Sequence, residues 1–143
     1  MDRLNPAFND AQADSDRDGM SNLWEFQMGL LAGTSDAYFD KDGDGMPNLY
    51  EYQMGFNATN SEDRVFGPDN DGLINIMEFL IGTSPLQFDT DGDGIDDGYE
   101  FLYEFDPLVA DSNLDSDNDL VSNLEEYKAG TNPRNFLSFP FFL

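Results

Sequence analysis

The segment DKDGDGMPNLYE, residues 40–51, places four carboxylates within one short stretch of chain. Alternate positions hold Asp40, Asp42 and Asp44, Gly45 follows them, and the run closes with Glu51. Carboxylates crowded in this way repel one another, so their placement needs a physical reason. Three readings are open: an acid–base catalytic pair, a solvated acidic loop, or a cage for a hard cation.

The same pattern occurs five times along the chain. The copies are DSDRDGMSNLWE (14–25), DKDGDGMPNLYE (40–51), GPDNDGLINIME (67–78), DTDGDGIDDGYE (89–100) and DSDNDLVSNLEE (115–126). Their starts lie 26, 27, 22 and 26 residues apart, which indicates a repeat protein. We number the copies as repeats 1 to 5 and the positions of each loop from 1 to 12. A chance acidic loop does not account for five matched copies.

Oxygen donors recur at fixed positions of these loops. Acids at positions 1, 3 and 5, glycine at 6, Asn or Asp at 9 and Glu at 12 follow the ligand order of an EF-hand-type calcium loop. In such a loop the backbone carbonyl of position 7 adds another oxygen. Several oxygens in a flexible arrangement favour Ca²⁺ over Mg²⁺, which requires a stricter octahedron. The expected cofactor is therefore Ca²⁺, with four to five ions per chain.

The predicted ligands follow from this order. They are Asp14, Asp16, Asp18, Met20, Asn22 and Glu25 in repeat 1; Asp40, Asp42, Asp44, Met46, Asn48 and Glu51 in repeat 2; Asp69, Asp71, Leu73, Asn75 and Glu78 in repeat 3; Asp89, Asp91, Asp93, Ile95, Asp97 and Glu100 in repeat 4; and Asp115, Asp117, Asp119, Val121, Asn123 and Glu126 in repeat 5. Repeat 3 begins with Gly67 instead of Asp, so the site at 67–78 is expected to be the weakest or to remain empty. Repeat 5 has Leu120 in place of the turn glycine, which predicts binding with a strained turn.

Short helices are expected after the loops. From position 9 onward, as in residues 22–29 and 123–130, the sequence predicts a helix of about two turns, because Asn suits a helix start and Gly the residue past its end. Sustained alternation of apolar and polar residues is missing, so little or no β-sheet is expected. The aromatic residues after the closing glutamates are expected in the core: Phe26, Tyr52, Phe79, Phe101 and Tyr127. The predicted fold is a small calcium-stapled array over residues 1–143, with short α-helices and calcium-binding loops.

Composition excludes several classes of function. The formal net charge of −24 argues against nucleic-acid binding and against docking on an anionic membrane. No apolar run approaches about 20 residues, so no membrane-spanning helix is expected. The chain has no histidine and no cysteine, which removes the commonest general base and any disulfide. Because 20 of the 30 acids lie at ligand positions, we do not expect an enzyme.

These residues resemble the bacterial calcium-binding repeats related to thrombospondin type 3 repeats. The shared signature is DxDxDGxxNxxE, an aromatic residue, and a linker such as GTSP at residues 82–85 or GTNP at 130–133. EF-hand and dockerin loops are similar, but they carry an apolar residue at position 8. In this chain position 7 is the apolar one, and position 8 is Ser21, Pro47, Ile74, Asp96 and Ser122. The resemblance implies an extracellular or cell-surface protein of a bacterium or archaeon. It also implies calcium-dependent rigidity, adhesion or scaffolding without catalysis, and a surface glycan or a protein as ligand.

The C-terminal segment 134–143 is strongly apolar. It holds Phe136, Phe139, Phe141, Phe142 and Leu143. Two readings are open: the tail folds back on its own array, or it docks on another subunit. The second reading predicts a homo-oligomer or filament, and hence a self-assembling surface fibre or tube. The alternative is a monomeric, calcium-rigidified spacer or adhesion module of a larger surface protein.

Overall fold

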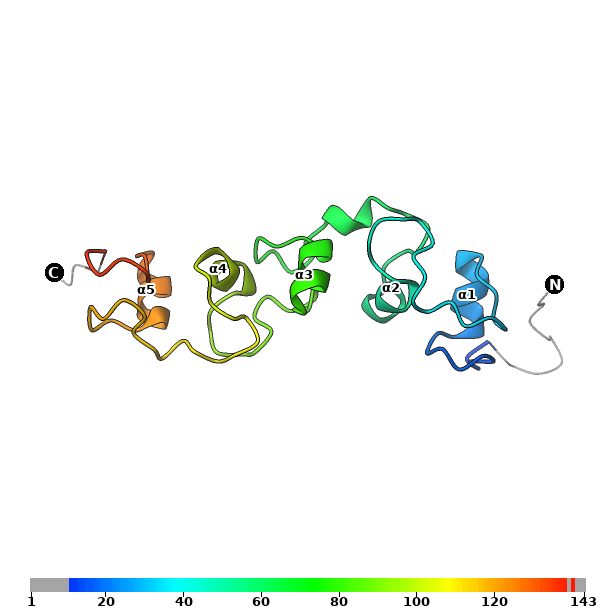
Figure 1. Cartoon of the computed structure of the whole chain (residues 1–143), viewed down its shortest axis with the longest axis horizontal. Helices are drawn as coiled ribbons and strands as arrows, with labels where there is room; N and C mark the ends of the chain where they lie inside the picture. Colours follow the sequence, from blue (N-terminus) through cyan, green and yellow to red (C-terminus); the bar gives the residue numbers. More distant parts are fainter. Residues whose placement is uncertain (1–10, 139, 141–143) are drawn as a thin grey trace. The chain divides into compact units, whose positions relative to one another are not determined.

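The structure is a computed structural model that describes residues 11–138 and 140. Its elements are α1 (Asn22–Met28), α2 (Asn48–Met54), the 3-10 helix η1 (Asp63–Val65), α3 (Asn75–Ile81), α4 (Asp97–Leu102) and α5 (Asn123–Ala129), shown in Figure 1. No β-strand occurs within the described residues. The prediction of short helices and loops without a sheet is therefore confirmed.

Each α-helix begins at position 9 of its loop, as the sequence predicts. The side chain of Ser21 caps α1 by accepting a hydrogen bond from the Trp24 N–H, and Ser122 with Glu125 forms a capping box on α5. Four helices end at a left-handed glycine, with φ between 68° and 88°: Gly29, Gly55, Gly82 and Gly130. Helices this short are not stable alone in water, so the loops must hold them.

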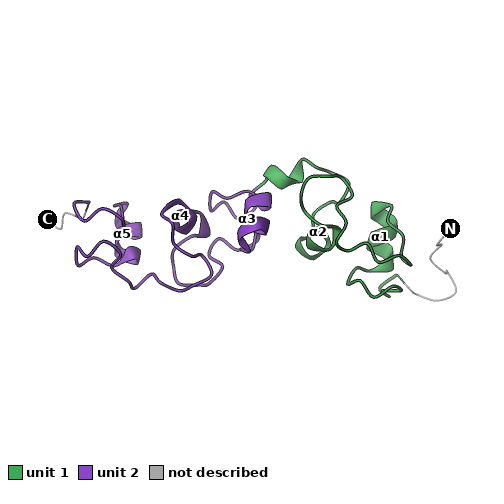
Figure 2. Ribbon diagram, viewed as in Figure 1, with its two compact units in different colours: residues 1–66 green, residues 67–143 purple. Residues whose placement is uncertain are grey.

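The chain forms two compact units, residues 1–66 and 67–143, coloured separately in Figure 2. The first unit contains repeats 1 and 2, and the rings of Trp24 and Tyr52 meet edge to face there, with centroids 5.1 Å apart. The second unit contains repeats 3, 4 and 5. Within it, Tyr99 meets Tyr127 at 4.9 Å, and the Tyr127 hydroxyl donates a 2.7 Å hydrogen bond to the Asp96 carboxylate. Aromatic pairs thus join α1 to α2 in the first unit and α4 to α5 in the second.

The expected burial of the aromatic residues after the glutamates is wrong in two repeats. Phe26 is 60 % exposed and Phe101 is 43 % exposed, whereas Tyr52, Phe79 and Tyr127 are half-buried. The physical reason is that acidic and amide side chains fill the interior of each repeat. The largest fully buried apolar side chains are Met20, Met46 and Ile95, and all three come from position 7 of a loop. Little apolar interior is left to receive a ring.

Two positions depart from the glycine pattern. Leu120 has φ 77°, where the glycines at position 6 of the other loops have φ between 99° and 103°. Glu104 has φ 60° at the place that glycine takes after the other helices. Arg134 compensates there, because its guanidinium donates hydrogen bonds to the carbonyls of Tyr103 (2.9 Å) and Glu104 (2.8 Å). It also lies 4.3 Å from the ring centroid of Phe105.

Candidate metal sites

The closing glutamate of every loop is completely buried. Both carboxylate oxygens lack a hydrogen-bond partner in each of these residues, all at 0 % exposure: Glu25, Glu51, Glu78, Glu100 and Glu126. Each lies in the first turn of a helix that starts at position 9 of the loop, which fixes its direction. A buried carboxylate without a partner is strongly unfavourable unless a cation or a proton neutralises it.

The loop aspartates converge beside these glutamates. One carboxylate oxygen each from Asp40, Asp42 and Asp44 lies within 4.8 Å of the other two. The same holds for Asp14, Asp16 and Asp18 in repeat 1, and for Asp69, Asp71 and Glu78 in repeat 3. The structure therefore brings together acids that the sequence assigns to one site.

Hydrogen bonds within the loop set the direction of the remaining oxygens. In repeat 2, Asp40 accepts the N–H groups of Gly43 (2.7 Å) and Gly45 (2.9 Å). Asp44 Oδ1 accepts the N–H of Met46 at 2.8 Å. The other oxygen of Asp44, and Oδ2 of Asp42, are buried without a partner. The backbone thus binds both oxygens of Asp40 and one oxygen each of Asp42 and Asp44, and it leaves the second oxygen of Asp42 and of Asp44 to a ligand.

Repeat 3 is built differently at its start. A side chain at Gly67 would place its Cβ 2.3 Å from the Leu73 carbonyl oxygen, so Asp does not fit there without a backbone shift. Oδ2 of Asp69, Oδ2 of Asp71 and both Glu78 oxygens are still buried and unpartnered. The weaker affinity expected for this site stays a prediction, now tied to one missing acid.

In repeats 1, 2 and 4, the side chain at position 9 accepts a hydrogen bond from the backbone of its own loop. Asn22 Oδ1 accepts the Ser15 N–H at 3.0 Å, and Asn48 Oδ1 accepts the Lys41 N–H at 3.1 Å. In repeat 4, Asp97 Oδ1 accepts the Thr90 N–H at 2.8 Å. These contacts bind position 2 of the same loop, and a ligand role for position 9 stays a prediction.

The glutamates carry the electrostatic signature of crowded acids. Burial, followed by the charges of Asp42 and Asp44, raises the pKa of Glu51 to about 8. The same causes, burial first and neighbouring aspartates second, raise the pKa of Glu25 and Glu126 to about 7, of Glu78 to about 8 and of Glu100 to about 9. A divalent cation in the loop would displace these protons and reverse the repulsion.

Sequence reasoning missed three acids that approach these sites from outside the loops. Asp36 has a carboxylate oxygen within 4.8 Å of those of Asp18 and Glu25, and Asp63 stands equally close to Asp44 and Glu51. Their position in the sequence could have identified them, because Asp36, Asp63 and Asp111 each precede the next loop by four residues. A repeat alignment extended upstream of position 1 would have found them.

The donor set fits a hard divalent cation. All side-chain donors are carboxylate or amide oxygens, and the chain offers no His or Cys for a softer metal. Buried oxygens without partners, in groups that carry several negative charges, are what Ca²⁺ coordination by flexible oxygen ligands requires.

Among the described residues, no helix has the length and apolar character needed to cross a membrane.

Comparison with known proteins agrees with this chemistry. Residues 89–110, which comprise the loop and helix of repeat 4 and the start of the following linker, match the family model described as bacterial TSP3 repeat. No curated protein and no solved structure matches the chain. The match confirms the resemblance drawn from the sequence, and it implies a calcium-binding structural repeat. Residues 89–110 are thus similar to a bacterial TSP3 repeat.

Proposed function

We propose that this protein is an extracellular structural protein in which Ca²⁺ ions fix each repeat, and that it has no catalytic role. The observation that supports calcium binding is the set of five closing glutamates, fully buried with both oxygens unpartnered. Without cations these repeats hold ionised or protonated acids where a protein normally has an apolar core. With Ca²⁺ the same acids become ligands, so ion binding and folding form one event.

The proposed location follows from calcium supply. Extracellular calcium saturates sites with dissociation constants of about 10⁻⁴ to 10⁻³ M, whereas cytosolic calcium does not. Four to five such sites would then be permanently loaded at a cell surface. Calcium would act there as a structural element, and not as a signal.

We further propose self-assembly into a surface fibre or tube through the apolar tail. In the described part of the tail, Phe136 is 61 % exposed and Leu137 is 70 % exposed. Phe139, Phe141, Phe142 and Leu143 lie outside the described residues. Exposed apolar side chains in sequence are typical of an interaction surface.

One observation favours the second candidate, a monomeric calcium-rigidified spacer or adhesion module with a surface glycan or protein as ligand. The chain before Phe136 is held on its own unit, because Arg134 binds the carbonyls of Tyr103 and Glu104. The N–H of Asn132 also donates to Ser138 Oγ at 3.0 Å. A tail that continues along the same unit would be covered within one molecule.

Deletion of residues 136–143 separates the two candidates. In millimolar calcium, the intact chain should form assemblies visible by negative-stain electron microscopy, and the truncated chain should remain monomeric with unchanged calcium binding by calorimetry. A control, Leu80→Ser, removes an apolar side chain that is 72 % exposed outside the tail and should leave assembly intact. Polymerisation of the truncated chain would show that the tail is not the connector. A monomeric intact chain at all calcium concentrations would favour the spacer.

A further inference from the structure

The linker acids are held in place from both neighbouring repeats. Asp18 Oδ2, at position 5 of repeat 1, accepts the N–H groups of Asp36 and Ala37, both at 3.1 Å. From the other side, Asn48 Nδ2 of repeat 2 donates to the Asp36 carbonyl at 2.9 Å. These contacts involve the backbone of Asp36. Its carboxylate lies near Glu25, and Oδ1 of Asp36 is buried without a hydrogen-bond partner.

The same arrangement recurs between repeats 4 and 5. Asp93, at position 5, accepts the N–H of Ser112 at 2.7 Å, and Asn123 Nδ2 donates to the Asp111 carbonyl at 3.2 Å. Asp111 Oδ1 is again buried without a hydrogen-bond partner. Beyond the effect of burial, the charges of Asp91, Asp93 and Asp111 raise the pKa of Glu100, in agreement with this proximity.

The linker between repeats 3 and 4 lacks the acid, because Pro85 occupies the place four residues before Asp89, the first aspartate of repeat 4. The same repeat is the one copy with an acid, Asp97, where the other four have Asn at position 9. Position 9 lies next to the missing acid: in repeats 2 and 5 its side-chain amide contacts the linker residue directly. Asp97 therefore occupies the position whose side chain, in repeats 2 and 5, lies beside the linker acid.

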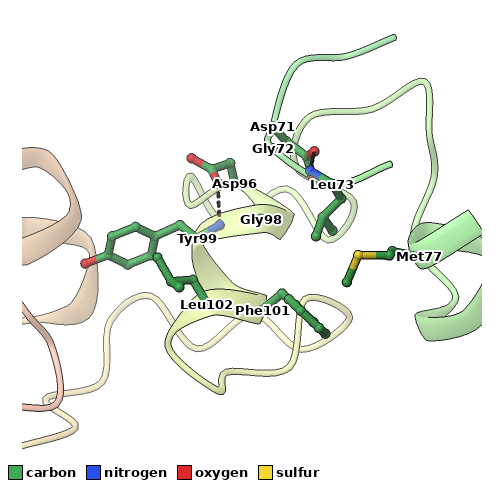
Figure 3. Close-up of a pocket in the computed structure, with 9 residues that line it drawn as sticks. All are labelled: Asp71, Gly72, Leu73, Met77, Asp96, Gly98, Tyr99, Phe101 and Leu102. Atoms are coloured by element: carbon green, nitrogen blue, oxygen red, sulfur yellow. Dashed lines mark hydrogen bonds between the residues drawn. The ribbon is translucent and has the colours of Figure 1, made fainter. Parts of the chain in front are cut away.

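The start of α4 touches the third loop closely. A side chain at Gly98 would place its Cβ 2.1 Å from the Asp71 carbonyl oxygen, so only glycine permits this approach. Figure 3 shows Gly98 on α4 near the segment that carries Asp71 and Leu73. These residues line an open pocket of about 580 Å³. The adjacent Asp97 is fully buried, and after burial the charges of Asp69, Asp71 and Asp97 raise the pKa of Glu78. Within its own loop, the Asp97 carboxylate accepts hydrogen bonds from the Thr90 N–H (2.8 Å) and the Thr90 hydroxyl (2.6 Å), and the charge of Asp89 acts on it.

We propose that the cation site of each of repeats 1 to 4 is completed by a carboxylate from the chain that follows it, and that Asp97 replaces the missing linker acid for repeat 3. The completing residues are Asp36 for repeat 1, Asp63 for repeat 2, Asp97 for repeat 3 and Asp111 for repeat 4. Asp36 and Asp63 each place a carboxylate oxygen within 4.8 Å of an oxygen of the buried, unpartnered glutamate of the site. The charges of Asp97 and Asp111 act on Glu78 and Glu100. Repeat 5 has Pro133 at the corresponding place of its linker, so its site relies on its own loop.

Two consequences follow for the molecule. A cation held in this way ties its own loop to the start of the next repeat, so binding should order the junction between them. Repeat 3, which lacks an aspartate at position 1, regains a carboxylate from Asp97. The inference rests on the proposed calcium binding and deepens it, since it assigns ligands that the loop motif does not contain.

The test measures whether each acid affects calcium binding by the repeat before it or by the repeat that contains or follows it. Asp97→Asn installs the residue that the other four repeats carry at position 9, and it keeps the oxygen that accepts the Thr90 N–H. In a calcium titration followed by amide NMR signals, we expect the midpoint at Gly72 of repeat 3 to rise at least about tenfold. The midpoint at Gly94 of repeat 4 should stay within about threefold. A matched control, Glu104→Gln, removes one charge from an exposed residue of the same unit and should move neither midpoint.

Asp36→Asn repeats the test in the first unit, with Gly19 of repeat 1 and Gly45 of repeat 2 as reporters. The Gly19 midpoint should rise at least about tenfold and the Gly45 midpoint should not. Effects confined to repeat 4 for Asp97→Asn and to repeat 2 for Asp36→Asn would overturn the inference. So would variants whose midpoints all equal those of a wild-type protein that binds calcium normally. Wild-type amide signals that do not respond to calcium would instead refute the proposed function itself, on which the inference depends.

Discussion

The carboxylates of Glu51 and Asp63 each place an oxygen within 4.8 Å of the other and of Asp44, although Asp63 lies beyond the end of α2. Both residues are buried, at 0 % and 6 % exposure. Like charges adopt such an arrangement only if something positive binds between them or if one of them holds a proton. The crowding that the sequence shows along one loop is therefore increased by the fold.

Glu51→Gln should change the stability of the protein in opposite directions with and without calcium. In calcium-free protein it removes a buried carboxyl whose pKa is raised to about 8 and which must take up a proton on folding at pH 7, so unfolding should become less favourable by about 1 to 3 kcal/mol. In saturating calcium it removes a ligand, and the variant should be less stable than wild type. Fluorescence of Trp24, the single tryptophan, reports thermal unfolding of this unit through its contact with Tyr52.

A suitable control for that experiment is Glu62→Gln, because Glu62 is exposed and belongs to the same unit. It should shift neither melting temperature appreciably. If Glu51→Gln destabilised the calcium-free protein as well, Glu51 would be an ordinary structural residue and not a metal ligand.

Calcium-free protein should lose stability as the pH rises. The folded pKa values of the closing glutamates, about 7 to 9, exceed that of an exposed glutamate, so the folded chain holds more protons between about pH 4.5 and pH 9. Each such group then costs up to about 1.4 kcal/mol per pH unit in that window. Thermal unfolding at pH 5, 6, 7 and 8 after treatment with a chelating resin measures this. With calcium present the trend should reverse, since Ca²⁺ competes with protons. A flat or rising melting temperature without calcium would contradict the electrostatic account.

Leu120→Gly should stabilise repeat 5. Leu120 is 93 % exposed and adopts φ 77°, a conformation that glycine takes without a Cβ penalty. We expect a gain of about 1 kcal/mol in the free energy of unfolding, measured in calcium by urea denaturation. Leu120→Ala provides the comparison, because it removes the same exposed side chain but keeps the Cβ. Equal stability of the two variants would show that the turn is unstrained.

Arg134→Ala should destabilise the second unit. The substitution removes two hydrogen bonds to the carbonyls of Tyr103 and Glu104 and the stacking on Phe105, which together contribute about 1 to 3 kcal/mol. Lys128→Ala removes an exposed cation from the same unit and serves as the control. Denaturation monitored by NMR at Phe105 should distinguish the two variants. An Arg134→Ala protein as stable as the control would mean that the Glu104 turn needs no such cap.

The sequence predicted the features that occur at the same position of every repeat. Position 9 marks the helix starts at Asn22, Asn48, Asn75, Asp97 and Asn123, because the cap and ligand positions recur with the loop. It did not reveal Asp63 or Arg134, since their partners lie in another repeat and the contact depends on how the linker turns back. The exposure of Phe26 was missed because an aromatic residue beside a helix normally marks an apolar core, whereas here carboxylates occupy the interior.

Circular dichroism across a calcium titration, paired with calorimetry on the same protein, tests the central claim most directly. Protein stripped of metal should gain helical signal as calcium is added, with four to five ions bound per chain, and excess EGTA should reverse the gain. Helicity that does not change on adding excess EGTA, together with no measurable heat of calcium binding, would contradict the account.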